Sequence, residues 1–268
     1  YFQGHKLVLI GFDMLVALCV KVPELTITKQ FYKSHLVFRF CEIFVGLLAQ
    51  LRLISSASEH QSTDCYDIIH KKGLFSNVIL VTSSFFQSVT LEVPTNNMPK
   101  IKPTLLELAR NQFEQIWQIE KDRPKIFVHI RRGDYVKWPT ITHPAVLPAK
   151  WYFSAMDKIF DSEFNPVYII FTDDVPYSED LFEDREDVLI SQCNETLDFA
   201  LMSLCDHGVL SASSFSWWAG LYSVQRTLTG ERYGSFVAPM FWIGHRKEKW
   251  HPVTLPYASW LEYILVWD

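Results

Sequence analysis

The sequence lacks several features that mark common classes of protein. Only 10 of its 268 residues are glycine, below the average of about 7%, which excludes collagen-like chains and glycine-rich linkers. None of the five cysteines forms a CxxC pair, so the spacing of zinc sites and thioredoxin-type redox sites is missing. A net charge of −5 argues against a general electrostatic affinity for nucleic acid. A bound anion must therefore be held by a local basic cluster.

Long hydrophobic runs are also scarce. The run from Leu7 to Val20 is interrupted by Asp13 and is shorter than the ~20 residues that a membrane helix needs. We expect it to form a buried strand or helix, and the remnant of a signal anchor is the alternative. Residues 1–4 resemble what remains of a cleaved affinity tag and are left out of the fold prediction. Hydrophobic residues still make up 49% of the chain, which is enough for a sizeable core.

The chain changes character near residue 103. Residues 5–102 mix helical and strand periodicity, end in a proline-rich linker at 92–103, and are predicted to form an amino-terminal domain. From Pro103 onward the pattern alternates between strands and helices, which predicts an α/β domain with a parallel sheet at 103–268. The predicted helices are 103–123, 148–160, 176–182, 195–205 and 215–227, and the predicted strands are 125–130, 167–171, 188–190, 208–211 and 235–238. Ligands of such sheets bind beyond the carboxyl ends of the strands.

The first polar motif, His-Ile-Arg-Arg-Gly-Asp-Tyr at residues 129–135, follows a predicted strand. Arginine offers a planar fork of donors that fits phosphate oxygens, so Arg131 and Arg132 are candidate anion ligands. The alternative is a salt-bridged loop in which Asp134 pairs with one of them. Side chains alternate along a strand, so we expect Arg131, on the side of His129, to bind the anion and Arg132 to hold the loop.

Two further motifs follow the next strands. Phe-Thr-Asp-Asp at 171–174 could accept hydrogen bonds from a ligand or hold a metal, and Asp174 could instead cap the following helix. The serine-rich segment 211–216 opens a helix, where unpaired backbone N–H groups and the helix dipole favour an anion. A plain serine cap is the alternative there. Together the three motifs predict an anionic, diphosphate-bearing ligand that needs no metal.

These three motifs resemble those of a known enzyme family. Residues 129–135 resemble the H-x-R-R-x-D motif of α-1,2- and α-1,6-fucosyltransferases and protein O-fucosyltransferases, and 171–174 resemble the F-[ST]-D-D segment of the α-1,2 branch, glycosyltransferase family 11. Residues 198–205 and 213–219 are similar to that branch's third block. The resemblance covers about residues 103–264. It implies two Rossmann-like domains of the GT-B type, the carboxyl-terminal one binding GDP-fucose and residues 5–102 lying on the acceptor side.

The resemblance also implies the reaction and the residues that carry it out. Fucose would pass from GDP-fucose, with inversion and without a required cofactor or metal, to O2 of a terminal β-galactose of a glycan acceptor. The residues implied in donor binding are His129, Arg131, Arg132, Asp173, Asp174, Ser213, Ser214 and Phe215. A base within about 3 Å of the acceptor hydroxyl would take its proton. Asp134 is the favoured base, and His143 and Asp174 are the alternatives. Arg131 is the second catalytic residue and would stabilise the charge of the leaving diphosphate.

The resemblance and the sequon at Asn194 predict a glycoprotein of the Golgi lumen, anchored as a single-pass type II membrane protein by a segment upstream of Lys6. Residues 5–102 do not contain the Gly-Gly-x-Gly-Asn-Gln-like segment with which most members of the family open. Two alternatives therefore stay open: a catalytically silent protein that binds a glycan or a partner, and a transferase that uses another nucleotide sugar.

Overall fold

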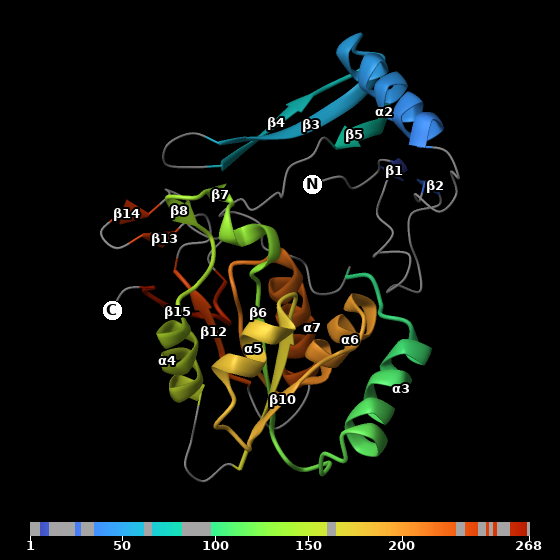
Figure 1. The fold of residues 1–268 in the computed structure, drawn as a ribbon. Coiled ribbons are helices and arrows are strands. Elements are labelled where there is room, and N and C mark those ends of the chain that lie inside the picture. Colours follow the sequence, from blue (N-terminus) through green and yellow to red (C-terminus); the bar gives the residue numbers. More distant parts are fainter. Residues whose placement is uncertain are drawn as a thin grey trace. The chain divides into compact units, whose positions relative to one another are not determined.

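The computed structural model describes residues 6–10, 25–27, 35–61, 66–81, 98–159, 165–228, 234–240, 245–246, 249–250 and 258–266. The chain divides into two compact units, residues 1–102 and residues 103–268 (Figure 1). The tag-like residues 1–4 lie outside the described residues, as does the first half, 92–97, of the linker predicted at 92–103. Among the helices in these ranges, none combines the length and the apolar character needed to cross a bilayer.

The amino-terminal unit contains a five-stranded sheet in the order β2-β1-β5-β3-β4. Its elements are β1 (Lys6–Ile10), β2 (Leu25–Ile27), α2 (His35–Gln50), β3 (Ile54–Gln61), β4 (Tyr66–Lys71) and β5 (Phe75–Val81). All neighbouring pairs are parallel except β3 and β4, which are antiparallel. The apolar run at 7–20 begins as strand β1, and its residues from 11 onward lie outside the described part of the chain.

The carboxyl-terminal unit is built on a six-stranded sheet in the order β10-β9-β6-β11-β12-β15. Its strands are β6 (Lys125–Ile130), β9 (Val167–Thr172), β10 (Val188–Ile190), β11 (His207–Val209), β12 (Phe236–Pro239) and β15 (Glu262–Ile264). Every neighbouring pair in this sheet is parallel. The α/β fold class predicted from the sequence is confirmed.

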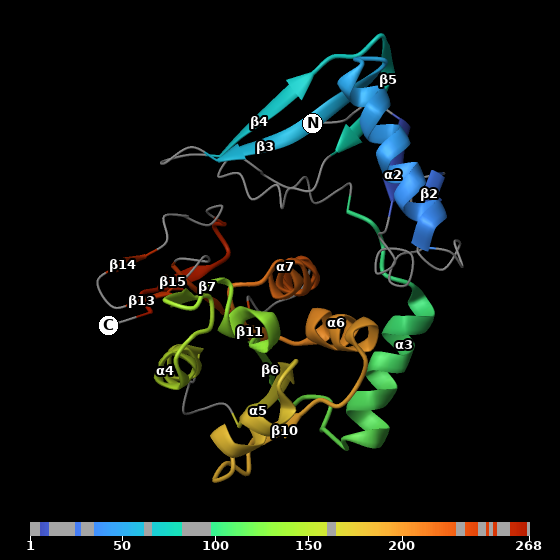
Figure 2. The ribbon, with the colours of Figure 1, turned by 45° about the horizontal axis from the view of Figure 1, so that its top comes forward.

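Helices cover both faces of this sheet. They are α3 (Pro103–Asn111), which continues as a π-helical turn η3 (Gln112–Ile116), α4 (Ala149–Ile159), α5 (Val175–Leu181), α6 (Glu195–Leu204) and α7 (Ser214–Leu228). Helices α4 and α5 lie on one side, and α3, α6 and α7 lie on the other (Figure 2). The sequence did not predict the 3-10 turn η4 (Gly133–Val136), the two short hairpins β7 (Pro139–Thr140) with β8 (His143–Pro144) and β13 (His245–Arg246) with β14 (Lys249–Trp250), or strand β15.

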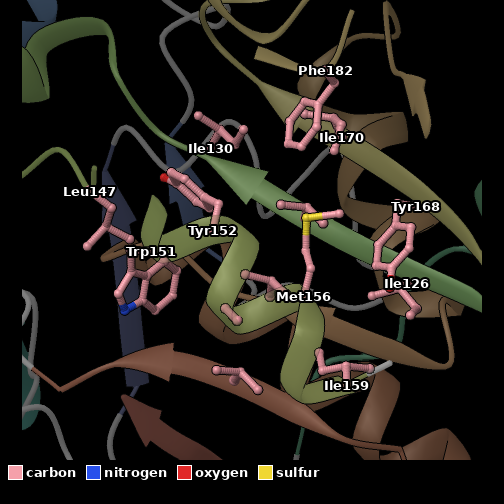
Figure 3. Packing of buried hydrophobic residues seen from close by; sticks show 14 of the residues in the cluster. Ile126, Ile130, Leu147, Trp151, Tyr152, Met156, Ile159, Tyr168, Ile170 and Phe182 are labelled. Atoms are coloured by element: carbon pink, nitrogen blue, oxygen red, sulfur yellow. The ribbon is translucent and has the colours of Figure 1, made fainter. Parts of the chain in front are cut away.

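Strand β6 is buried on both faces, as its unbroken apolar run requires. On one face Ile126, Val128 and Ile130 join the main core cluster with Trp151 and Tyr152 of α4 (Figure 3). On the other face Phe127 packs against β11, where a Cβ at position 208 would come within 2.3 Å of its ring. Glycine at 208 therefore lets β11 lie close to Phe127.

Candidate functional site

The three polar motifs meet at the carboxyl edge of the second sheet. Strand β6 pairs with β9 on one side and with β11 on the other, so the segments after all three strands are neighbours. Ile130 lies opposite Thr172 in the register of β6 and β9, directly before Arg131 and Asp173 in the sequence. The parallel register thus brings together residues about 40 positions apart.

Arg132 is held against the first turn of α5. Its Nε donates a hydrogen bond to Asp174 Oδ2 at 2.9 Å, and its guanidinium lies 3.6 Å from the centre of the Tyr177 ring. A planar guanidinium stacked on an aromatic ring and tied to a carboxylate is strongly fixed in direction. These contacts place Arg132 as a support of the loop.

Arg131 has a different set of partners. Its Nη2 is 2.5 Å from Asp134 Oδ1, and its Nη1 is 2.6 Å from Asp173 Oδ2. The guanidinium also lies 5.2 Å from the centre of the Tyr135 ring. Two carboxylates hold the fork of Arg131 in place, and about a third of its side chain remains exposed. A phosphate group could replace either carboxylate, because it accepts the same pair of N–H donors.

The two neighbouring aspartates have separate tasks. Asp173 accepts a hydrogen bond from the backbone N–H of Arg132 at 2.7 Å while it binds the Arg131 side chain. Asp174 caps α5 by accepting a hydrogen bond from the backbone N–H of Tyr177 at 3.3 Å, as the capping interpretation predicted. A Cβ at position 133 would come within 2.5 Å of Asp173 Oδ2, so glycine at 133 leaves room for that carboxylate.

His129 links β6 to the serine-rich segment. Its Nδ1 is 2.6 Å from Ser211 Oγ, and its ring centre is 5.6 Å from that of Phe215 in α7. Burial, together with the nearby charge of Arg131, lowers the pKa of the His129 imidazole to about 3. The ring is therefore neutral at pH 7. A buried neutral histidine with a hydroxyl partner acts here as a link between strand ends.

The start of α7 faces the same edge. Ser213 Oγ accepts a hydrogen bond from the backbone N–H of Phe215 at 3.3 Å, which is the plain serine cap considered above. Ser214, the first residue of α7, is exposed. Ala212 packs against Tyr135, the residue that lies under Arg131. The helix start and the first arginine therefore belong to one continuous cluster.

Some contributing residues had no role in the sequence prediction. Tyr177 and Tyr135 lie under the two arginines, and no pattern along the chain indicated those contacts. Asp198, in the first turn of α6, accepts a 2.6 Å hydrogen bond from Ser191 Oγ. Burial raises its pKa to about 7, and the hydrogen bond from Ser191 partly opposes that rise. Its place in the third motif was the only signal.

The remaining candidates lie away from this cluster of contacts or have structural partners. His143 belongs to the short strand β8, and its backbone N–H donates to Thr140 Oγ1. Asn194 is exposed and caps α6, with its Oδ1 accepting a hydrogen bond from the backbone N–H of Leu197 at 3.0 Å. Across the parts of the chain that the structure describes, no group of three or more His, Cys, Asp or Glu side chains is arranged to hold a metal ion.

Comparison with known proteins identifies the family. The profile of glycosyl transferase family 11 matches residues 66–233, which is more than half of the chain. The O-antigen biosynthesis glycosyltransferase WbnK of Escherichia coli is 31% identical over 144 residues, covering 50% of this chain and 48% of WbnK. The galactoside 2-alpha-L-fucosyltransferase SEC1 of Bos taurus is 27% identical over 147 residues, covering 47% of this chain and 40% of that relative. The chain thus matches less than half the length of either curated relative.

Two further matches are more distant. An alpha-1,2-colitosyltransferase of Escherichia coli is 28% identical over 124 residues, covering 44% of this chain and 41% of that relative. The solved structure of the fucosyltransferase NodZ from Bradyrhizobium aligns with 78% of this chain and 76% of its own, with 12% identity and a TM-score of 0.42. So weak a structural similarity supports no conclusion. The profile match over residues 66–233, which includes all three motifs, shows that the chain belongs to glycosyl transferase family 11.

Proposed function

We propose that the protein transfers fucose from GDP-fucose to a hydroxyl group of a glycan, O2 of a terminal β-galactose, as an enzyme of the GT-B type. The observation that carries this proposal is the Arg131 guanidinium, one-third exposed and held by Asp134 and Asp173 beside the start of α7. A diphosphate leaving group gains negative charge as the sugar departs, and preorganised donors stabilise that charge. The family and the names of SEC1 and its mammalian relatives support fucose as the sugar.

The reaction that we propose inverts the anomeric carbon. The acceptor hydroxyl attacks C1 of fucose from the face opposite the diphosphate, the bond from C1 to the diphosphate oxygen breaks, and GDP leaves. Arg131 and the N–H groups at the start of α7 would bind the diphosphate, with Ser213, Ser214 and Phe215 forming that turn. Arg132, Asp173, Asp174 and His129 would hold the strand ends in place.

Asp134 is the base that we propose for the acceptor proton. Its carboxylate is mostly exposed and touches Arg131, which would bring it beside the reacting sugar when the diphosphate is bound. Since Arg131 and the helix start already supply positive charge, we also propose that no divalent metal is required. Calorimetric titration with GDP in EDTA, and again in excess Mg²⁺, tests this: equal affinities are expected, and a loss of binding in EDTA would contradict it.

Activity decides between this function and its alternatives. The test is donor hydrolysis with GDP-fucose, followed by transfer to a glycan array that includes terminal β-galactosides. GDP binding without turnover would indicate a silent relative. Turnover of a different nucleotide sugar would favour the second candidate, which the similarity to the alpha-1,2-colitosyltransferase supports. Parallel assays with GDP-fucose and other GDP-linked deoxysugars separate the two donors.

We further propose that the native protein acts in the Golgi lumen, attached by an amino-terminal membrane anchor. The exposed Asn194 supports this: its Oδ1 caps α6, and its Nδ2 is the atom that would carry the glycan. Removal of N-glycans from protein made in a secretory host should lower its mass, and Asn194→Gln should abolish that change. A native coding sequence with no hydrophobic segment upstream of Lys6 would contradict the anchor.

A further inference from the structure

Tyr152 lies in the core directly beneath the arginine motif. It belongs to α4, is 1% exposed, and packs in the main cluster beside Ile130, the last residue of β6 (Figure 3). Its ring makes an edge-to-face contact with Trp151, with ring centres 5.4 Å apart. Packing therefore holds the side chain in one orientation, with little freedom for its hydroxyl to move.

That hydroxyl is an exception among buried polar groups. Within the described residues it forms no hydrogen bond, although its oxygen is fully buried. Buried hydroxyls almost always have a partner, and leaving one unpaired costs about 1–3 kcal/mol. Phenylalanine would fill the same space without this cost. The chain therefore carries an unpaired group at a position where an apolar residue would pack equally well.

The surroundings of the hydroxyl point to the site. Burial raises the pKa of Tyr152 well above its usual value, and Tyr177, Arg132, Asp173 and the backbone N–H of Arg131 are near enough to affect that pKa. The phenol keeps its proton at pH 7 and is therefore not a general base. The backbone N–H of Arg131 faces its oxygen and acts to lower that pKa, but the pair does not reach the distance and angle of a full hydrogen bond.

We propose, on the basis of the function proposed above, that Tyr152 is a positioning residue for the diphosphate-binding turn, and that its hydroxyl accepts a hydrogen bond from the backbone N–H of Arg131 when the donor is bound. Without a donor, Asp134 and Asp173 hold the Arg131 guanidinium. A bound diphosphate replaces one of these carboxylates on the guanidinium and shifts Arg131, which brings its backbone N–H to the hydroxyl oxygen of Tyr152. Hydrogen bonds of a catalytic site often reach good geometry only in the complex.

The substitution Tyr152→Phe separates this role from a structural one. Because the lost hydroxyl is unpaired without donor, the melting temperature should stay the same or rise. The dissociation constant for GDP, measured by calorimetry, should increase about tenfold, the equivalent of one hydrogen bond of about 1.4 kcal/mol. The kcat/KM for GDP-fucose should fall by a similar factor.

Tyr168→Phe is the matched control. Tyr168 is also 1% exposed and belongs to the same core cluster, but it lies near the start of β9, where its hydroxyl interacts with Arg185. This variant should lose some thermal stability and bind GDP like the parent protein. A GDP defect in Tyr168→Phe equal to that in Tyr152→Phe would show a general effect of the core and would overturn the proposal.

Amide hydrogen exchange provides a second readout. In GDP-saturated protein the backbone N–H of Arg131 should exchange faster in Tyr152→Phe than in the parent, and without GDP the two should not differ. Equal exchange in the GDP complexes, or parental GDP affinity in Tyr152→Phe, would overturn the role of Tyr152 while the proposed function stands. A parent protein that binds no GDP would overturn both.

Discussion

Replacing Arg131 by lysine tests the centre of the proposed site. The two terminal nitrogens of Arg131 each hold a different carboxylate, Asp134 at 2.5 Å and Asp173 at 2.6 Å. A lysine keeps the positive charge but presents it as a single ammonium group without the planar fork. The variant therefore removes the geometry of the contact and leaves the net charge of the protein unchanged.

The structure predicts a small effect on stability and a large effect on catalysis. The side chains of Arg131, Asp134 and Asp173 are 35%, 65% and 27% exposed, so solvent screens both ion pairs and each contributes at most about 1 kcal/mol. Each kcal/mol of lost stability lowers the melting temperature of a protein of this size by about 2–4 °C, so the fall should be small. Loss of a positioned donor to the leaving diphosphate should lower kcat about 100-fold, or about 2.7 kcal/mol.

Steady-state kinetics with GDP-fucose and a terminal β-galactoside, paired with melting curves, measures both effects. Arg185→Lys is the control, since Arg185 also pairs with an aspartate, Asp187, and lies 4.8 Å from the centre of a tyrosine ring, but before β10 at the opposite edge of the sheet. It should lose stability without losing activity. Arg132→Lys should lose more stability than Arg131→Lys, because its guanidinium lies 3.6 Å from the Tyr177 ring centre.

The opposite pattern would refute this reasoning. If Arg131→Lys keeps near-normal turnover and donor affinity while Arg132→Lys loses both at an unchanged melting temperature, Arg132 binds the diphosphate and the two roles are reversed. If all three variants are kinetically normal, the arginine motif does not contact the donor and the proposed site is wrong.

Three further outcomes are expected. Gly133→Ala places a Cβ 2.5 Å from Asp173 Oδ2, so that carboxylate must shift from its position on Arg131, and we expect GDP affinity to fall about tenfold by calorimetry; unchanged affinity would contradict a role for that ion pair. Burial raises the pKa of Asp198 in the folded protein to about 7 from 3.8, so its contribution to stability is lost as pH rises from 4 to 7. The free energy of unfolding should fall in this range by up to about 1.4 kcal/mol per pH unit, and denaturant titrations of Asp198→Asn should show a weaker pH dependence. The pKa of His129 in the folded protein is lowered to about 3 from 6.5, so the free energy of unfolding should decrease as pH falls from 6.5 to 3. In the same titrations His129→Gln should reduce this decrease, and an unchanged pH profile of stability would show that the ring is not buried against Ser211.

The regular elements after Pro103 could be predicted from the sequence because their signals are local. Strand β6 is an unbroken apolar run in a sheet covered on both faces, and its predicted bounds, 125–130, are confirmed. The helix predicted from 195 begins there because Asn194 caps it. Strand β15 at 262–264 was not predicted, because three residues at a sheet edge differ little from a loop in composition. The helix predicted at 103–123 is shorter and changes to a π-helical turn at Gln112.

Which side chains meet was decided only by the tertiary structure. The sequence by itself determined that arginines, aspartates and serines follow buried strands, and that parallel strands end at one edge. The alternative of a salt-bridged loop left open which arginine pairs with Asp134, and the structure pairs it with Arg131. The register of β6 against β9 brings Asp173 and Asp174 to the two arginines, and burial raises the pKa of Asp198 to about 7. Pairing and burial depend on residues distant in sequence, so only the folded chain determines them.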